Sequence, residues 1–308
     1  MPDYDVFVVG DYCLDLILTG LPSLPELGKE IVATGCEQTP GGAYNAAVAM
    51  HRLGLRVAWA ADFGSDPYSQ LVLEHVRAEG LDESHFIHHP RPLRNLTVAA
   101  SFPADRAFLA FYDPPPAIPA AVRALSRVRA RVLYIPGLYS GPLLDAALLM
   151  VRARRMQIVM DGNSYESARM SSPRVRRALR AADILMPNAS EAFRLTGEAD
   201  LLRSLHVLAS LTPCVVIKDG AGGAYACEAG QVAYAPALPV QPLDTTGAGD
   251  TFDAGFVAAR LEGKPLTVCL QWGNIVGGLS TLGAGGTGRV VTRQDVEGLM
   301  VPIGARGT

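Results

Sequence analysis

The chain has 308 residues, of which 49% are hydrophobic and 19% are charged, so it can bury a sizeable core and extensive disorder is excluded. The length suits one large α/β domain, and we expect a single domain over residues 1–308. The formal net charge of −3 argues against binding to nucleic acid or an acidic membrane and favours a small-molecule partner.

The cysteine pattern and the N-terminal region predict the compartment. The five cysteines are scattered and form no CxxC pair, which is typical of reduced thiols in the cytosol. The apolar run over residues 6–18 has no basic leader and is interrupted by Asp11 and Asp15, which argues against a signal peptide and a membrane span. We therefore expect a cytoplasmic protein.

Short apolar runs rich in β-branched residues recur along the chain and are typical of strands that are buried on both faces of a sheet. They cover residues 6–9, 56–60, 132–135, 158–160, 184–186 and 215–217. Longer stretches with helical periodicity lie between some of them, at residues 43–53, 67–79 and 142–155. The alternation predicts a mostly parallel sheet covered by helices.

Residues 30–38 and 95–112 interrupt this alternation, because they have strand-like composition without an intervening helical pattern. Residues 103–106, with the sequence PADR, predict a hairpin turn inside the second segment. We expect the two segments to form a small separate sheet. Since the first segment ends just before the pair Gly41 and Gly42, this sheet is placed to act as a lid over a ligand there.

The most distinctive motif is DTTGAGDTFDAGF at residues 244–256, which is followed by helical periodicity. Gly247 and Gly249 allow a tight turn whose N–H groups point outward at the start of the helix, so an anion can bind there. Asp250 is then placed to accept a proton from an attacking hydroxyl. Taken alone, Asp250 and Asp253 are more typical of ordinary acidic residues in the first turn of a helix.

A second motif, PGGAYNAAVAMHRLG, spans residues 40–54. Gly41 and Gly42 permit close approach of a ligand to the backbone, and the Asn45 amide offers a donor and an acceptor to a diol. By itself the motif also fits a glycine turn that enters an amphipathic helix. Asp15 follows the first predicted strand, and ligands of open α/β sheets bind outside the carboxyl ends of strands, although a solvent-facing loop aspartate fits about equally well.

In their order and spacing, the two motifs resemble the signatures of the ribokinase (PfkB) family of carbohydrate kinases, and the resemblance extends from residue 6 to about residue 296. It implies an α/β fold, namely a ribokinase-like three-layer αβα sandwich with a mostly parallel central sheet and a small β lid. It also implies ATP-dependent transfer of a phosphoryl group to a hydroxyl of a small sugar or sugar-like alcohol. The roles that the resemblance implies are a base at Asp250, an anion hole at Gly247, Ala248 and Gly249, and an acceptor site at Asp15, Gly41, Gly42 and Asn45.

Asn188 and Glu191 follow the predicted strand 184–186. Locally they have the pattern of a capping box, with Asn188 as the N-cap and Glu191 three residues later. They also match the NxxE motif of the family, whose acidic residue organises water around the Mg²⁺ bound to the nucleotide phosphates. The motif therefore predicts Glu191 near Mg²⁺ and Asn188 near ATP, with the capping box as the alternative.

The resemblance implies contacts with ATP for four further residues, namely Lys218, Gly220, Gly223 and Asn274. The first three belong to a glycine turn after the strand 215–217 that any β-hairpin could also carry, and a surface position on a helix explains Asn274 nearly as well. Asp244 and Thr246 match positions at which many family members bind a monovalent cation such as K⁺. An aspartate that merely stabilises a turn has the same pattern.

Three other functions have partial support in the sequence, and each is disfavoured by a particular feature. The run GAGGTG at residues 283–288 has the GxGxxG spelling of an NAD-binding oxidoreductase, but it follows a helical stretch and too little chain remains after it. A non-catalytic sugar-binding protein would be expected to lack Asp250 or the GAG run. Vitamin kinases of the pyridoxal type generally lack the lid and the glycine pair.

The acceptor stays open between a sugar, a sugar acid and a nucleoside. Residues 137–141 contain no glutamate of the kind that accompanies ribose specificity in the family, which argues against ribose. The glycine turn also lacks the lysine that phosphosugar kinases of the family often carry, which favours an unphosphorylated acceptor. Because lids in the family often pair between subunits and an uncovered small sheet has edges to protect, we expect a homodimer.

Overall fold

The computed structural model describes residues 2–102, 106–140, 142–164 and 167–300. Its main feature is an eight-stranded sheet in the order β14-β13-β12-β11-β10-β9-β1-β4. The strands from β12 to β4 pair in parallel, and β13 and β14 add an antiparallel hairpin at one edge. These strands span Tyr4–Val9 (β1), Val57–Ala60 (β4), Ala130–Ile135 (β9), Gln157–Asp161 (β10), Ile184–Met186 (β11), Cys214–Lys218 (β12), Ala224–Glu228 (β13) and Gln231–Ala235 (β14).

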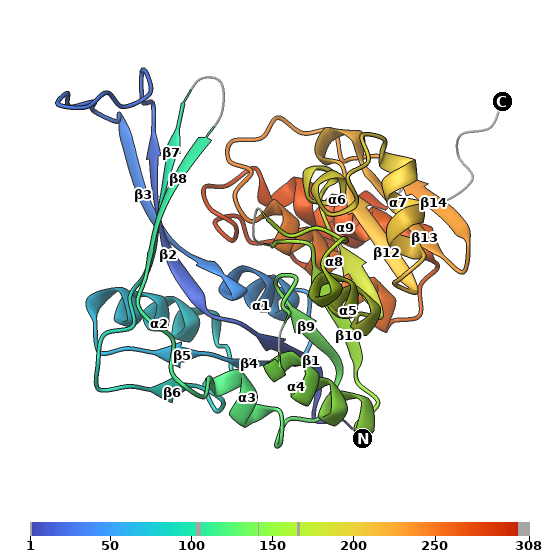
Figure 1. Cartoon of the computed structure of the whole chain (residues 1–308). Helices are drawn as coiled ribbons and strands as arrows, with labels where there is room; N and C mark the ends of the chain where they lie inside the picture. The colour runs from blue at the N-terminus through green and yellow to red at the C-terminus, as the bar shows by residue number, and fades with distance from the viewer. Residues whose placement is uncertain (1, 103–105, 141, 165–166, 301–308) are drawn as a thin grey trace.

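Alternate residues of β1 face opposite sides of the sheet, and this alternation builds two apolar cores. Val6 and Val8 belong to the core with α1, α2, α8, α9 and α10, whereas Phe7 belongs to the core with α3 to α7. The predicted three-layer αβα sandwich with a mostly parallel sheet is thus confirmed (Figure 1). The helices span Ala43–Arg52 (α1), Pro67–Glu79 (α2), Ala120–Ala124 (α3), Pro142–Ala153 (α4), Pro173–Ala181 (α5), Ala189–Thr196 (α6), Leu201–Ala209 (α7), Ala248–Leu261 (α8), Leu266–Ser280 (α9) and Arg293–Leu299 (α10).

A second sheet of four strands projects from the body, in the order β3-β2-β7-β8 (Figure 1). β2 pairs antiparallel with β3 and parallel with β7, so it is an inner strand. The predicted small separate sheet is therefore present, and we call it the projecting sheet. Its strands span Tyr12–Thr19 (β2), Gly35–Gly42 (β3), Asn95–Ser101 (β7) and Arg106–Tyr112 (β8).

Two details of this sheet differ from the prediction. Its first predicted segment, residues 30–38, is displaced, because the strand lies at Gly35–Gly42 and includes the glycine pair. Asp15 lies within β2 rather than in a loop, since the chain passes almost directly from the central sheet into the projecting sheet. Residues 103–105 of the predicted hairpin turn lie outside the described residues.

Two remaining segments complete the fold. β5 (Asp62–Phe63) pairs with β6 (Ile87–His88) in a third, short sheet. Residues 283–288 form turns after α9 rather than a junction between a strand and a helix, which agrees with the rejection of a dinucleotide-binding site there. Within the described ranges, no helix combines the length and the apolar character needed to cross a membrane.

Candidate active site

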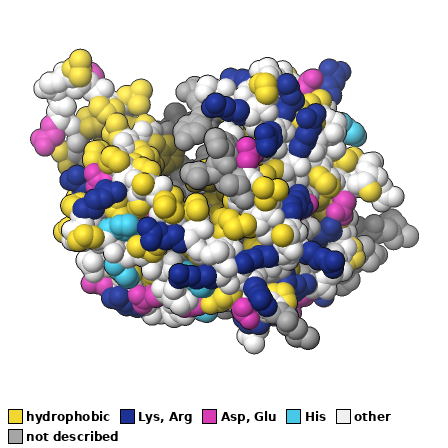
Figure 2. Space-filling view, turned by 60° about the horizontal axis from the view of Figure 1, so that its bottom comes forward, with side chains coloured by type: hydrophobic (Ala, Val, Ile, Leu, Met, Phe, Trp, Pro, Cys, Tyr) yellow, Lys and Arg dark blue, Asp and Glu magenta, His cyan; other side chains and the backbone are white. Residues whose placement is uncertain are grey.

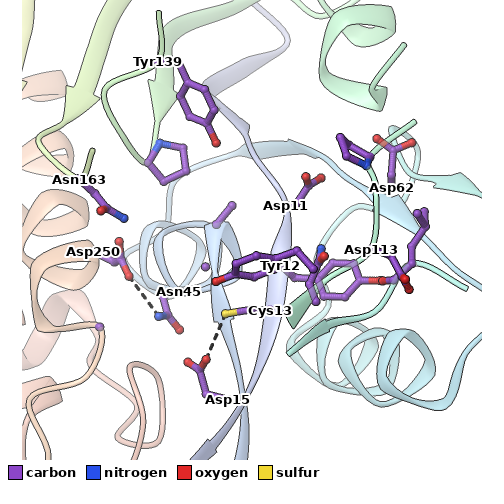
Figure 3. A pocket seen from close by; sticks show the side chains of 18 of the residues that line it. Asp11, Tyr12, Cys13, Asp15, Asn45, Asp62, Asp113, Tyr139, Asn163 and Asp250 are labelled. Atoms are coloured by element: carbon purple, nitrogen blue, oxygen red, sulfur yellow. Dashed lines mark hydrogen bonds between the residues drawn. The ribbon is translucent and has the colours of Figure 1, made fainter. Parts of the chain in front are cut away.

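A cleft of about 490 Å³ lies at the carboxyl edge of the central sheet, beside the base of the projecting sheet (Figure 3). Its walls come from β2, from the loops after β1, β9 and β10, and from the first turns of α1 and α8. A cleft of this volume suits a small-molecule ligand. The predicted site residues that line it are Asp15, Gly42, Asn45, Thr246, Gly247 and Asp250.

The two sequence motifs meet at a contact between Asn45 and Asp250. Asp250 lies in the first turn of α8, and Asn45 in the first turn of α1 donates a hydrogen bond from Nδ2 to Asp250 Oδ2 at 3.1 Å (Figure 3). The Asn45 side chain is buried, and its Oδ1 has no hydrogen-bond partner in the described part of the chain. The contact fixes the orientation of the Asp250 carboxyl and leaves an acceptor atom available.

Glycine shapes the start of α8. Gly247 precedes the helix with φ of 68°, a left-handed conformation that glycine adopts without strain. A Cβ atom on this residue would lie 2.8 Å from Asn45 Nδ2, so the close approach also requires glycine. Ala248 and Gly249 then open the helix, and the first N–H groups of a helix lack intrahelical partners and attract an anion. The predicted anion hole and the predicted base are therefore adjacent.

The surroundings of Asp250 shift its titration. Its pKa is raised to about 7, first by burial and then by the nearby Asp161 carboxylate, while the Asn45 hydrogen bond and the Lys218 ammonium oppose this shift. A carboxylate whose pKa lies near neutrality is suited to accept a proton during a reaction.

A buried ion network lies beneath the start of α8. Lys218 Nζ contacts Asp161 Oδ2 at 2.6 Å and Asp253 Oδ1 at 2.9 Å, and the Tyr134 hydroxyl donates to Asp253 Oδ2 at 2.9 Å. Burial by itself would lower the pKa of Lys218, but the two carboxylates raise it, so the lysine stays charged. The structure thus places Lys218, predicted to contact ATP, in an internal network close to Gly249.

The other predicted acceptor residues surround Asp15. Asp15 is 7% exposed, and its carboxylate accepts a hydrogen bond from Cys13 Sγ at 3.1 Å. Burial raises the pKa of Asp15. A Cβ atom on Gly41, which pairs with Cys13 across the β2–β3 ladder, would collide with the Asp15 carboxylate. Gly41 therefore makes room for Asp15, and Gly42 lines the cleft directly.

Asn188 and Glu191 form the capping box that the local pattern predicts. Asn188 Oδ1 accepts from the Glu191 N–H at 2.9 Å, and Glu191 Oε2 accepts from the Asn188 N–H at 2.8 Å. The pKa of Glu191 is nevertheless raised to about 7, first by burial and then by the Asp161 carboxylate. The hydrogen bond from Asn188 N does not offset the effects that raise the pKa of Glu191. The capping box is therefore compatible with a role of this carboxylate near a cation.

The remaining residues predicted to bind ATP lie outside the cleft lining. Asn274 Nδ2 donates to the carbonyl oxygens of Ala235 and Pro236 at 2.9 and 3.0 Å, so it holds the chain after β14. Gly220 begins a short 3₁₀ turn after β12, and Gly223 follows it in close contact with Ala235. Gly223 and Asn274 therefore both lie against the chain at the end of β14, and Gly220 belongs to the same turn as Gly223. The two hydrogen bonds of Asn274 account for its burial.

Asp244 connects two loops beside the predicted anion hole. Its Oδ1 accepts from Thr246 N at 2.9 Å and from Thr246 Oγ1 at 2.7 Å, while Oδ2 accepts from Gly285 N at 2.8 Å. This is the turn-stabilising arrangement that the sequence also predicted. It anchors the loop at residues 283–288 against the residues that precede α8.

Several lining residues were missed from the sequence, notably Asp62, Asp113 and Asn163. Asn163 lies two residues after β10, and Asp62 lies two residues after β4. The rule that selected Asp15, a polar side chain just after a buried strand, would have identified both. Asp113 follows β8. The end of this strand depends on its pairing with β7, so it could not be predicted from the sequence alone.

Comparison with known proteins places these features in a family. The model of the pfkB family carbohydrate kinases matches residues 4–292. The ribokinase of Bacillus subtilis is 27% identical over 306 residues, covering 96% of this chain and 99% of that protein.

Solved structures show the same fold. The ribokinase of Arabidopsis thaliana, complexed with ribose and ATP, superposes with a TM-score of 0.80 at 21% identity and covers 96% of this chain and 98% of its own. A putative ribokinase of Agrobacterium tumefaciens gives a TM-score of 0.79 at 22% identity, with 96% of each chain covered.

Proposed function

Because the chain belongs to the pfkB family of carbohydrate kinases, we propose that it is a cytoplasmic, ATP-dependent kinase that phosphorylates a hydroxyl of a small sugar or sugar-like alcohol. The observation that carries this proposal is the position of Asp250, which faces the cleft from the first turn of α8 beside Asn45. In this proposal residues 1–308 act as one domain, and the projecting sheet is its lid.

The proposed reaction is a direct phosphoryl transfer. The acceptor hydroxyl gives its proton to the Asp250 carboxylate, and its oxygen forms a bond to the γ-phosphorus of ATP. The bond from that phosphorus to the bridging oxygen of the β-phosphate breaks, and ADP leaves with the electron pair. The N–H groups at residues 247–249 stabilise the charge on the transferring group. Asp15, Gly41, Gly42 and Asn45 hold the acceptor.

The residues present fit a Mg²⁺ ion bound together with ATP. The described ranges contain no group of three or more His, Cys, Asp or Glu side chains arranged to hold a metal. Mg²⁺ commonly keeps several waters and binds through one or two carboxylates plus phosphates, and the poorly compensated Glu191 beside Asp161 suits that mode. When bound, the ion neutralises charge on the phosphates. Asn188 orients Glu191 through the capping box.

Some of the residues predicted at the nucleotide would contact it, and the others would support the site from inside the protein. Gly220 and Gly223 offer backbone to ATP, whereas Lys218 and Asn274 support the site through the internal hydrogen bonds described above. A K⁺ ion, if used, would lie beside the Asp244 and Thr246 turn, which is tied to the loop at 283–288. A nucleoside or a sugar acid remains the alternative acceptor.

We further propose that two copies pair through their projecting sheets. β8 is an edge strand of this sheet and carries four exposed apolar side chains, with exposures between 51% and 67%: Phe108, Leu109, Phe111 and Tyr112. Apolar side chains gather on the projecting lobe at the left of Figure 2. Exposed apolar surface on an edge strand favours pairing with another sheet.

The kinase proposal is tested by incubating the protein with ATP, Mg²⁺ and a panel of free sugars, sugar acids and nucleosides. Phosphorylated product detected by mass spectrometry, together with stoichiometric ADP, is the expected result for at least one acceptor. The matched control is Asp250→Asn, which keeps the shape of the side chain. Product formed equally by both proteins, or by neither on any compound, would contradict the proposal.

A further inference from the structure

The cleft is strongly acidic along its whole length. Five carboxylates line it, and no Lys, Arg or His side chain is among the described residues that do so. Figure 3 shows Asp62 and Asp113 on the side of the cleft away from Asp250, with Asp11 between the two sides. The five are Asp11, Asp15, Asp62, Asp113 and Asp250.

Asp15 and Asp250 accept the side-chain hydrogen bonds described above, and Asp62 and Asp113 also have local partners. Asp62 Oδ1 lies 2.7 Å from His89 Nε2, and its Oδ2 accepts from Ala120 N at 2.7 Å. Asp113 accepts two hydrogen bonds from the Arg94 guanidinium, at 2.9 and 3.1 Å. These two carboxylates are therefore held by the protein itself.

Asp11 is different. It is exposed to the cleft, and its carboxylate forms no hydrogen bond or ion pair with any residue in the described ranges. Reduced solvation of its carboxyl inside the cleft and the neighbouring Asp62 carboxylate raise the pKa of Asp11 to about 6, so a cationic group nearby would stabilise its ionised form. Within the described ranges, Asp11 thus lacks side-chain partners of the kind that Asp62 and Asp113 each have.

Asn45 provides a second, independent observation at the same cleft. Its side chain is only 3% exposed, lines the cleft, and has an Oδ1 atom without a donor among the described residues. An acceptor atom in such a place costs free energy unless a ligand supplies the donor. The cleft therefore presents acceptor atoms and negative charge that a ligand rich in donors would satisfy.

We propose that the acceptor is a basic alcohol, whose protonated amino group binds at Asp11 while its reacting hydroxyl lies at Asp250. This inference rests on the proposed kinase function and specifies its substrate class. An ammonium group has three donors, no acceptor and a positive charge, which matches the unpaired carboxylate. A carboxylate or phosphate on the acceptor would be repelled by the same lining, so sugar acids are disfavoured.

The test compares matched triplets on pentose, hexose and nucleoside skeletons, each as the neutral compound, its amino derivative and its carboxylic acid. With ATP and Mg²⁺, kcat/KM for the amino form should exceed that for the neutral form by about tenfold or more, and the acid should be the poorest. Asp11→Asn should reduce the ratio of amino to neutral turnover to near one. Glu74→Gln, which removes an exposed carboxylate on α2, should leave the ratio unchanged.

The outcomes separate the two proposals. Phosphorylation of a neutral or acidic member without preference for the amino form overturns the inference and leaves the kinase function standing. A preference that survives Asp11→Asn also overturns it. If no member is phosphorylated, the kinase proposal fails for these compounds, and calorimetry on the same set decides the charge preference, with equal binding or no binding of the amino forms counting against it.

Discussion

Asp250 shows how a residue acquires its chemistry from its surroundings. An aspartate in the first turn of an exposed helix only complements the macrodipole, and the local sequence gives no more than that. Here the residue is half-buried, lies near a second carboxylate, and is oriented by an amide from a helix 205 positions away in the sequence. Burial and the neighbouring charge disfavour ionisation, which makes the carboxylate a better proton acceptor near neutral pH.

Asp250→Asn should reduce kcat by roughly 10²-fold or more, because it removes the proton acceptor and keeps the shape. Binding of ATP, measured by calorimetry, should change little. The thermal unfolding midpoint should not fall, since the substitution removes a half-buried charge that accepts one side-chain hydrogen bond, from Asn45, within the described residues. Turnover within a few-fold of the unsubstituted protein would remove Asp250 from the role of base.

The pH dependence of kcat/KM should show the ionisation of Asp250. A base must be ionised, and Asp250 with a pKa of about 7 is protonated below that pH, so activity should fall about tenfold per pH unit below 7 and level off above it. Glu191 has a similar pKa, so the profile of Glu191→Gln serves as the control and should retain the acidic limb. A flat profile between pH 5 and 8 would argue against a base with this pKa.

Glu191→Gln tests the second carboxylate near the site. If Glu191 organises Mg²⁺ and its water, the variant should need a several-fold higher Mg²⁺ concentration for half-maximal rate. Gln still accepts the hydrogen bond from Asn188 N, so the capping box should persist and thermal stability should change little. A lower unfolding midpoint with unchanged Mg²⁺ dependence would show that the residue acts only as a cap.

At the level of single residues, the sequence identified residues that line the cleft better than it identified the contacts that support the cleft. Asp250 and Asn45 stand in motifs whose glycines have a clear physical purpose. Lys218 and Asn274 were expected at the nucleotide, yet both are buried and bonded to segments distant in the sequence. Such partners depend on the tertiary fold, so no local pattern could have revealed them.

Elements bounded by strong local signals were predicted most closely. α2 begins and ends where predicted, because Asp66 caps it, Pro67 occupies its first turn, and Gly80 ends it with φ of 71°. The strands of the projecting sheet have no such signals. Their limits depend on pairing between β2, β3 and β7, which is not local, so the strand at Gly35–Gly42 was displaced in the prediction.

The element that carries Asp15 connects the body with the projecting sheet. Because Asp15 lies within the inner strand β2, between Thr39 on one side and Thr97 on the other, its carboxylate is held by a ladder rather than by a loop. A ligand bound there would lie against the base of the sheet. The position supports the proposed role of this sheet as a lid that excludes water from the reaction.

Asp15→Ala should raise KM for the acceptor by about tenfold or more and leave KM for ATP almost unchanged. The physical reason is that hydrogen bonds from hydroxyls to a carboxylate contribute roughly 1.5 to 3 kcal/mol each. Asp15→Asn is the matched control, since it keeps the size and one acceptor oxygen and should have a smaller effect. An effect on ATP alone, or on neither KM, would show that the acceptor lies elsewhere.

At the scale of the whole molecule, the two apolar cores cover both faces of the central sheet, but the projecting sheet extends beyond them (Figure 1). Its order β3-β2-β7-β8 leaves β3 and β8 as edges. Tyr112 at the end of β8 also lines the cleft, so a partner on this strand would lie close to the proposed acceptor site. Pairing through the projecting sheet would therefore protect an edge and help to enclose the cleft.

Sedimentation velocity should accordingly show a dimer at micromolar concentration. Leu109→Glu places a charge in the middle of the exposed apolar part of β8 and should shift the protein to a monomer, because burying an unpaired carboxylate in an interface is costly. Leu149→Glu, at an exposed position on α4, is the matched control and should leave the dimer intact. A monomeric parent protein would exclude the pairing, and a dimer that survives Leu109→Glu would place the interface on another surface.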